Sequence, residues 1–161
     1  MSKPYFTRTN KILEVCSWIL LLLSFGVAIY GMCTLPDTIP IHFALDGTPN
    51  GYGSPGSLLV FPIIMLFALG IISLVAHLLR PEEWNMPFQV KERYKNEVFA
   101  CILSMMFLIQ LESAVLTLFI QVQSVQLTGK GALPTVGIYI VAMTATILIL
   151  WVKAGKINNK F

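Results

Sequence analysis

Long apolar runs alternate with short polar segments along this chain. Four runs are long enough to cross a bilayer as helices, since roughly 18 consecutive apolar residues suffice. They cover residues 15–34, 58–79, 98–122 and 133–152. Helices are expected because lipid cannot satisfy free backbone amides, and the short alternating strands of a membrane barrel are missing. The pattern predicts an all-α integral membrane four-helix bundle, with residues 1–161 forming a single domain.

The basic residues predict how the bundle is oriented. All but one of the eleven lysines and arginines lie in the two tails or in segment 80–97, and Lys130 is the exception. Because lysine and arginine are retained on the cytoplasmic side, both termini and segment 80–97 are expected in the cytoplasm. Segment 35–57 is then expected outside. The ten residues are Lys3, Arg8, Lys11, Arg80, Lys91, Arg93, Lys95, Lys153, Lys156 and Lys160.

Composition narrows the function classes. A net charge of +3 and 12% charged residues give no basic face for nucleic acid. Cys16, Cys33 and Cys101 lack the close spacing of a metal or redox motif. Phosphate loops, nucleophile elbows and zinc-protease helices are also missing from the sequence. We therefore expect a protein that is not an enzyme and carries neither a metal nor another cofactor.

The outer segment 35–57 is too long for a simple connector and has its own structural signals. Ile39, Ile41 and Phe43 alternate with other residues in a strand-like pattern. Loops of this length in a small domain tend to be functional. We predict a compact loop packed on the mouth of the bundle. Turns are predicted at Asp46-Gly47, Asn50-Gly51 and Ser54-Pro55-Gly56.

The motif of this loop resembles that of a known group. It reads Leu35-Pro36-Asp37-x-Ile39-Pro40-Ile41-His42-Phe43, then Gly47-x-Pro49-Asn50-Gly51-Tyr52-Gly53-Ser54. This resembles the SdpI-like toxin-immunity membrane proteins and the wider family of domains of unknown function that shares the Ile-Pro-x-His-Phe loop. The resemblance implies a bacterial cytoplasmic membrane, and an outer loop that binds an extracellular peptide, toxin or envelope component in immunity or sensing.

Two positions depart from that family pattern. Ala44 stands where the family usually has Asn or Asp, and Pro55 stands where it usually has Lys. If the family lysine binds an anionic group, this chain has lost that contact.

His42 is the sharpest binding candidate in the outer loop. It lies near Asp37 and Asp46 in sequence, and a histidine can change charge near neutral pH or bind a polar partner. The alternative is that it hydrogen-bonds the loop backbone and holds the loop in shape. A metal would need three or four ligands, and His77 is expected toward the opposite membrane side. The candidate ligand-binding residues are His42, Asp46, Gly47, Tyr52 and Asp37.

The third apolar run carries a second, competing site. Glu112 falls near its middle, where a carboxylate is costly and is by default a functional hypothesis. It is expected to be protonated, hydrogen-bonded to another helix or facing water. Its candidate partners are Ser24, Ser73, Tyr139, Thr144 and Thr146. The alternative function is accordingly a small transporter or channel component.

A stripe of polar residues lies on another face of the same run. Its residues recur at helical spacing, and the first of them, Gln110, lies about 200° around the helix from Glu112. The stripe consists of Gln110, Ser113, Thr117 and Gln121. The stripe must face protein or water, so it either lines a shallow outward cavity or packs against helices, including those of a homo-oligomer.

Two further faces are expected to make contacts. Val90, Tyr94 and Val98 are four apart, which fits one side of a cytoplasmic helix entering the third run; the alternative is a solvated, charged loop with a helical end. Segment 80–97 is a candidate surface for a cytoplasmic protein partner. In the first run, small residues share one face, where another helix is expected to pack. They are Ser17, Ser24, Ala28 and Gly31.

Overall fold

Four long helices account for most of the chain in the computed structural model, which describes residues 4–129 and 131–160. The helices are α1 (Arg8–Thr34), α2 (Val60–Leu78), α3 (Lys95–Val125) and α4 (Ala132–Asn158). Strands β1 (Ile39–Phe43) and β2 (Pro49–Gly53) connect α1 to α2. Short 3-10 helices cover Pro55–Leu59, Pro81–Glu83 and Glu92–Tyr94.

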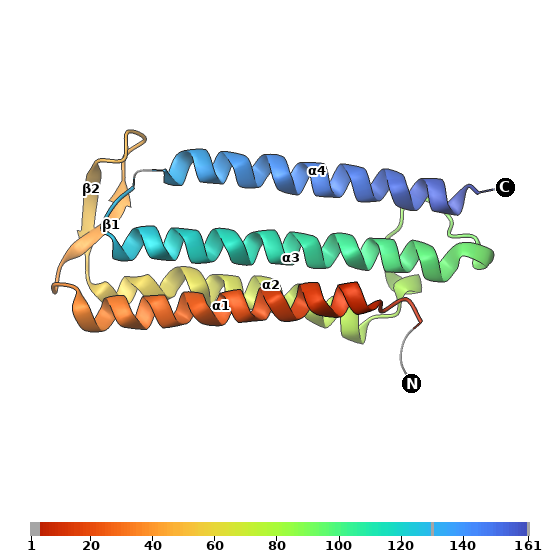
Figure 1. Ribbon diagram of the computed structural model, residues 1–161, viewed down its shortest axis with the longest axis horizontal. Helices are drawn as coiled ribbons and strands as arrows, with labels where there is room; N and C mark the ends of the chain where they lie inside the picture. The colour runs from red at the N-terminus through yellow and green to blue at the C-terminus, as the bar shows by residue number, and fades with distance from the viewer. Residues whose placement is uncertain (1–3, 130, 161) are drawn as a thin grey trace.

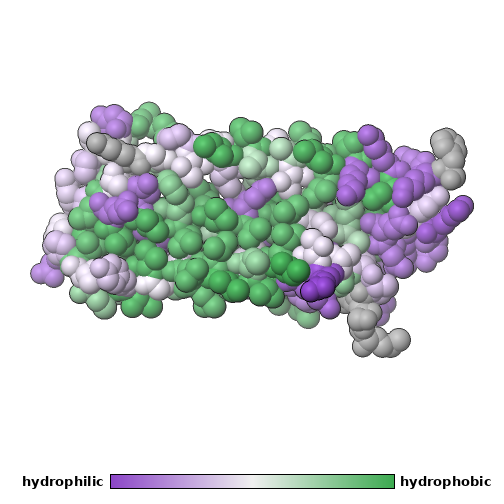
Figure 2. Space-filling model, in the orientation of Figure 1, coloured by the Kyte–Doolittle hydropathy of each residue, from purple (hydrophilic) through white to green (hydrophobic). Residues whose placement is uncertain are grey.

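All four helices are long and apolar enough to cross a membrane. Their outward side chains are apolar: Leu22, Phe67 and Val141 are 67–69% exposed. Figure 2 shows a hydrophobic surface along the helices and hydrophilic groups gathered toward the ends. Such a large exposed apolar surface is stable only against lipid. The chain is a multi-pass membrane protein with the predicted all-α four-helix architecture.

Helix α3 is the centre of the bundle. Figure 1 shows it between α4 on one side and α1 with α2 on the other. Half of its most apolar stretch is buried, whereas none of the corresponding stretch of α4 is. Within its most apolar stretch, helix α4 therefore packs on α3 with one side and leaves its other sides free to face lipid.

The polar stripe of α3 packs inside the bundle, which is one of the two predicted alternatives, and Gln121 at its end also lines a cavity under the outer loop. Gln110, Ser113, Thr117 and Gln121 are 0–6% exposed. The small-residue face of α1 is also buried, which confirms that a helix packs there: Ser17, Ser24, Ala28 and Gly31. At Gly31 an added Cβ would lie 2.7 Å from Leu58 and 2.8 Å from Val125. The glycine thus allows α1 to approach α3 and the start of α2 closely.

Helices α1, α3 and α4 extend further than the apolar runs that predicted them, whereas α2 is slightly shorter than its run. Helix α1 begins at Arg8 because the side chain of Thr7 accepts the N–H of Asn10 and caps it. Helix α3 is 31 residues long, about 46 Å, against about 30 Å of hydrocarbon. An apolar run marks the part immersed in lipid, but a helix continues through the polar interface until its backbone is capped.

The two ends of the bundle differ in character. Both termini and the α2–α3 connection lie at one end, called here the basic end, and the β-strands lie at the other, the hairpin end (Figure 1). The basic residues of the described tails and of segment 80–97 gather at the basic end, while Lys3 and Lys130 lie outside the described residues. The arrangement is the one that the charge pattern requires, and the side of the membrane each end faces stays a prediction.

Segment 80–97 is close to the second of its two predicted forms, a solvated, charged loop with a helical end. Helix α3 begins only at Lys95, so the helix predicted to run through Val90 is wrong. Most of the segment is exposed, but Val90 and Tyr94 pack on a core cluster that includes Val98. Asn158 at the end of α4 fixes the segment: it accepts the N–H of Lys91 at 2.8 Å and donates to the carbonyl of Gln89 at 3.0 Å. A periodic pattern could not reveal this clamp because its two halves are far apart in the chain.

Candidate binding site at the hairpin end

The outer loop is a β-hairpin. The alternation of Ile39, Ile41 and Phe43 predicted its first strand, and the second strand was not predicted. Strands β1 and β2 pair antiparallel, with Ile39 opposite Gly53 and Phe43 opposite Pro49. The turn lies at Ala44–Gly47, where the Gly47 N–H donates to the Ala44 carbonyl at 2.9 Å. Gly47 has a φ of 83°, a value that favours glycine. The predicted Asn50-Gly51 turn is wrong: both residues lie within β2, since the ladder uses their backbone.

Asp46 stabilises this turn. Its carboxylate accepts the Thr48 hydroxyl at 2.6 Å and the Thr48 backbone N–H at 2.9 Å. These hydrogen bonds, the hydroxyl foremost, hold the pKa of the Asp46 carboxyl below its ordinary value of 3.8. Asp46 and Gly47 therefore shape the hairpin tip together.

The tip is expected to open in acid. Because the folded pKa of Asp46 is lowered, its stabilising contribution is complete above the ordinary pKa and is lost as pH falls through the lowered value. Thr48→Val should move the Asp46 pKa back toward its ordinary value, as measured by NMR titration of the carboxyl carbon. Thr38→Val, which lies outside the turn, is the control. An unchanged pKa in Thr48→Val would mean that the hydroxyl does not hold the carboxylate.

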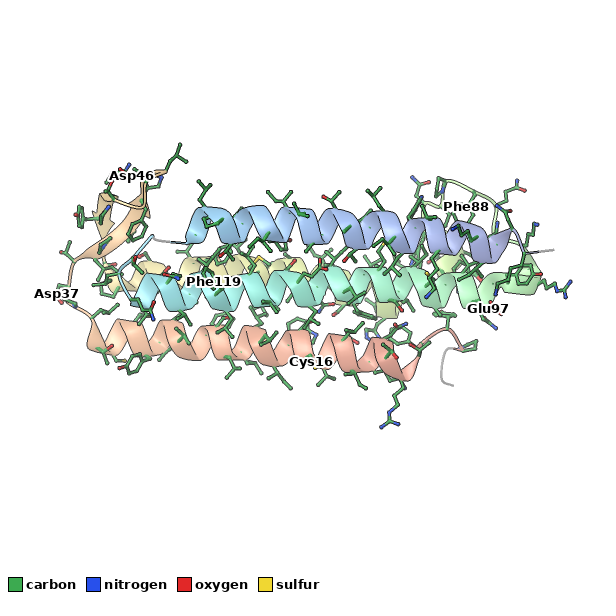
Figure 3. All side chains as sticks on the ribbon, turned by 45° about the horizontal axis from the view of Figure 1, so that its top comes forward. Cys16, Asp37, Asp46, Phe88, Glu97 and Phe119 are labelled. Atoms are coloured by element: carbon green, nitrogen blue, oxygen red, sulfur yellow. The ribbon has the colours of Figure 1, made fainter. Side chains whose placement is uncertain are left out.

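The five predicted loop residues do not form one cluster. His42 is exposed, and its Nδ1 contacts the Asn50 side chain on the neighbouring strand. Asp37 lies beside the end of α1, whereas Asp46 lies at the far tip of the hairpin (Figure 3). Tyr52 is 62% exposed on β2. The nearest polar partner of His42 is thus Asn50, a residue of the quoted motif that was assigned only to a turn.

The hairpin is seated on the helices by apolar contacts at its base. Ile39 is fully buried and packs with Ala28 of α1 and Leu58 at the entry to α2. Phe43 lies against the α3–α4 connection, where a Cβ added to Gly129 would be 2.7 Å from its ring. The hairpin therefore bridges from α1 to the α3–α4 connection across the mouth of the bundle.

A cavity of about 540 Å³ lies beneath this bridge. Volumes of 300–1,000 Å³ are typical of small-molecule sites. Its walls come from β1, the start of α2, the end of α3 and the start of α4. The residues that matter most for its chemistry are Pro40, Ile41, His42, Phe43, Phe61, Ile64, Ile120, Gln121, Gln123 and Ser124.

Two glutamines of α3 are among the polar residues that line this mostly apolar cavity. The Gln121 amide donates to the Leu58 carbonyl at 2.9 Å, so it is used within the fold. Gln123 differs, because its Oε1 is buried and accepts no hydrogen bond from the described residues. A buried acceptor without a partner is costly. The cavity is therefore suited to an apolar group that carries a hydrogen-bond donor.

Gln123 was not among the predicted site residues. It lies well off the face defined by Gln110 and Gln121, so helical spacing did not select it. The only signal was a further amide in the last turns of an apolar helix. Its importance depends on the hairpin and the start of α4, which approach it only in the folded chain.

The intramembrane candidate, Glu112, lies between α3 and α4. Thr146 donates its hydroxyl to Glu112 Oε1 at 2.6 Å, which confirms one of the predicted partners. The other carboxyl oxygen is buried with no hydrogen bond from residues 4–129 or 131–160. Ser113 and Tyr139 make a second polar contact between the same helices at 3.0 Å. Nothing brings Glu112 close to the hairpin-end cavity, so the two are separate sites.

The Glu112–Thr146 contact should stabilise the α3–α4 packing. Thr146→Val keeps the shape but removes the donor, and should lower the free energy of unfolding by about 0.5–1.5 kcal/mol. Glu112→Gln retains an acceptor oxygen and should cost less. The measurement is reversible unfolding in mixed detergent micelles. Thr144→Val is the control, since Thr144 is exposed and bonds its own helix at Ile140. Equal losses at both threonines would contradict the assignment.

The chain is similar to known proteins in the part that contains the hairpin. Residues 19–66 match a family described as a domain of unknown function, DUF1648. An uncharacterized protein of Archaeoglobus fulgidus is 32% identical over 71 residues, which are 44% of this chain and 35% of that protein. The chain thus spans about a third of the length of that relative. No solved structure matches it. The matched family segment runs from α1 through the hairpin into α2, so the chain is similar there to a domain of unknown function.

Proposed function

We propose that this protein is a non-enzymatic receptor of a bacterial cytoplasmic membrane that binds an extracellular peptide, toxin or envelope component at the hairpin-end cavity. Its termini face the cytoplasm in this proposal, and the hairpin faces outward. The observation that supports it is the buried Oε1 of Gln123, which has no hydrogen-bond donor among the described residues and belongs to the lining of a mostly apolar cavity. Immunity to a toxin and envelope sensing are the two biological forms that the resemblance of the loop implies.

The chemistry of the cavity defines the ligand in general terms. An apolar side chain or chain segment would contact Phe61, Ile64 and Ile120. A hydroxyl or amide N–H of the same ligand would donate to Gln123. His42 lies on the wall formed by β1 and is exposed, so it can meet the ligand before it enters.

A protection assay tests the proposal. The protein is produced in a toxin-sensitive bacterium, and survival is measured in medium conditioned by the source strain. Gln123→Leu should remove protection because it removes the acceptor without emptying the space. Gln126→Leu is the matched control, since Gln126 is exposed and is not part of the cavity lining. Protection that survives Gln123→Leu and His42→Ala would reject the cavity as the binding site.

A small transporter or channel component is the second candidate function. It is favoured by one observation, the buried carboxyl oxygen of Glu112 without a hydrogen-bond partner among the described residues. Polar groups at this depth often mark ion or proton paths. If the protein is a transporter or channel component, Glu112→Gln should abolish transport and Gln123→Leu should leave it intact. If it is a receptor, Gln123→Leu should abolish protection and Glu112→Gln should leave it intact. The same two variants therefore distinguish the two functions.

A further inference from the structure

A second cavity, of about 380 Å³, lies at the basic end, opposite the hairpin. The chain between α2 and α3 curls over the start of α3 to form it, and Figure 3 shows Phe88 of this segment near the end of α4. Its lining combines aromatic and apolar side chains with polar ones. The aromatic and apolar ones include Trp84, Met86, Phe88 and Phe99, and the polar ones are Glu82, Asn85, Glu92 and Lys95. The rings of Trp84 and Phe99 meet edge to face at 5.9 Å.

The segment that forms this cavity is held in place by hydrogen bonds and a ring contact to α4. Asn158, 4% exposed, clamps the backbone at Gln89 and Lys91. Phe88 packs against Trp151 of α4 with ring centroids 6.3 Å apart. The segment is therefore fixed at its far side before any ligand arrives, which lowers the cost of binding.

The rim of the cavity carries charges of both signs. Lys95 Nζ lies 2.6 Å from Glu82 and 3.5 Å from Glu92. The hydrogen bond from Lys95 lowers the pKa of Glu82, so these two groups satisfy each other. The side chain of Glu92 is 87% exposed, and its charge is only weakly engaged. The rim thus presents one surplus carboxylate beside aromatic walls, an arrangement that attracts an organic ammonium group.

A hydrogen-bond donor is buried in the wall of the same cavity. The indole Nε1 of Trp84 is shielded from solvent and meets no acceptor in the described part of the chain. Buried donors of this kind are rare in folded proteins and call for a partner. The partner must be an acceptor, because the indole nitrogen only donates.

An apolar cavity adjoins the first. It measures about 360 Å³ and shares Trp84, Asn85 and Met86 with it. Most of its remaining walls are apolar side chains of or next to α2, α3 and α4, including Leu79, Ile102, Met105 and Met106, and Glu83 also lines it. The two cavities meet at the Trp84–Met86 segment, with a charged rim on one and mostly apolar walls in the other.

We propose that this pair of cavities binds one phospholipid with a zwitterionic ammonium headgroup, from the leaflet at the basic end. The ammonium group lies by Glu92 and the aromatic walls, a phosphate oxygen accepts the Trp84 N–H, and part of an acyl chain fills the apolar cavity. Each part of the lipid accounts for one observation: the surplus carboxylate, the indole donor that has no acceptor in the described part of the chain, and the adjoining, mostly apolar cavity. The site is independent of the hairpin-end receptor function.

Lipid retention tests the assignment. The full-length protein is placed in nanodiscs with equal phosphatidylethanolamine and phosphatidylglycerol, released into mild detergent, and weighed intact with its bound lipids. The expected result is one retained lipid, chiefly phosphatidylethanolamine. Glu92→Gln should reduce that preference about two- to fivefold, as for an exposed ion pair. Trp84→Phe should weaken retention of both lipids about tenfold, because it removes the donor and keeps an aromatic ring.

Controls distinguish a site from general damage. Glu97→Gln removes a carboxylate that pairs with Lys160 and lies outside the cavity lining. Trp18→Phe removes an indole in a different cluster, with Leu21 and Leu69. Both should retain lipid as the wild type does. The same loss in the controls, or no loss in Trp84→Phe, would overturn the proposal. Displacement of the lipid by soluble phosphoethanolamine at equal concentration would overturn the acyl-chain contact and indicate a small-molecule site.

Discussion

Gln121→Leu is expected to lower the free energy of unfolding by about 1–2 kcal/mol, although it replaces a polar residue by an apolar one inside a membrane protein. Gln121 is 1% exposed and donates to the Leu58 carbonyl at 2.9 Å. In a continuous helix that carbonyl would accept the N–H four residues later, but residue 62 is a proline and has none. The side chain of α3 supplies the donor that the backbone of α2 lacks.

A double-mutant cycle gives this explanation a sharp test. Pro62→Ala restores a backbone N–H within reach of the Leu58 carbonyl, so Gln121→Leu should cost less in that background, with a coupling of about 1 kcal/mol. Unfolding in mixed micelles gives the free energy of unfolding of the wild type, the two single variants and the double variant. Gln126→Leu, at an exposed position, is the control for losing an amide. An equal cost with and without the proline would mean that Gln121 stabilises the fold by packing alone.

The architecture could be read from the sequence because lipid imposes a simple rule on it. Any stretch that crosses hydrocarbon must be long, apolar and helical, so four runs predicted four helices. The orientation of the stripe from Gln110 to Gln121 could also be predicted, since polar side chains are not stable against lipid and must face protein or water. The structure turns them inward, where Gln110 donates to Ser73 at 3.3 Å and Gln121 to Leu58.

The site was harder to predict because it depends on segments that are distant in the chain. The hairpin motif showed where a shaped loop would be, and the strand pattern was confirmed. What it could not show is that Phe43 reaches Gly129, or that the space enclosed below contains Gln123. Asn158, which clamps Gln89 and Lys91, is a similar case at the other end. Each of these residues is unremarkable in its local sequence and gains its role only from tertiary contacts.

Gln121 and Gln123 illustrate how function can be separated from structure in such a helix. They are two residues apart and both touch the hairpin-end cavity. The first has its amide engaged by a backbone carbonyl, whereas the second has a buried oxygen without a partner among the described residues. Substitution of Gln121 should therefore change stability first, and substitution of Gln123 should change binding first.

Gly31→Leu is expected to destabilise the bundle by about 2–3 kcal/mol, whereas Gly26→Leu should be neutral or stabilising. Both glycines lie in α1, so both changes gain about 0.5–1 kcal/mol from helix propensity. At Gly26 an added Cβ meets nothing within 4 Å, and the residue is exposed. At Gly31 the Cβ alone would lie 2.7 Å from Leu58 and 2.8 Å from Val125, so a leucine would displace the buried Leu58 and the partly buried Val125.

The damage at Gly31 should also reach the binding site, which distinguishes it from a local clash. Leu58 packs with Ile39 at the base of the hairpin, so moving it shifts the seat of β1 and the roof of the cavity. Reversible unfolding measures the stability change, and protection in the survival assay measures the binding. Equal stability of the two variants would show that α1 does not approach the entry to α2 as closely as described. Lost stability with intact protection would show that the hairpin keeps its position independently of α1.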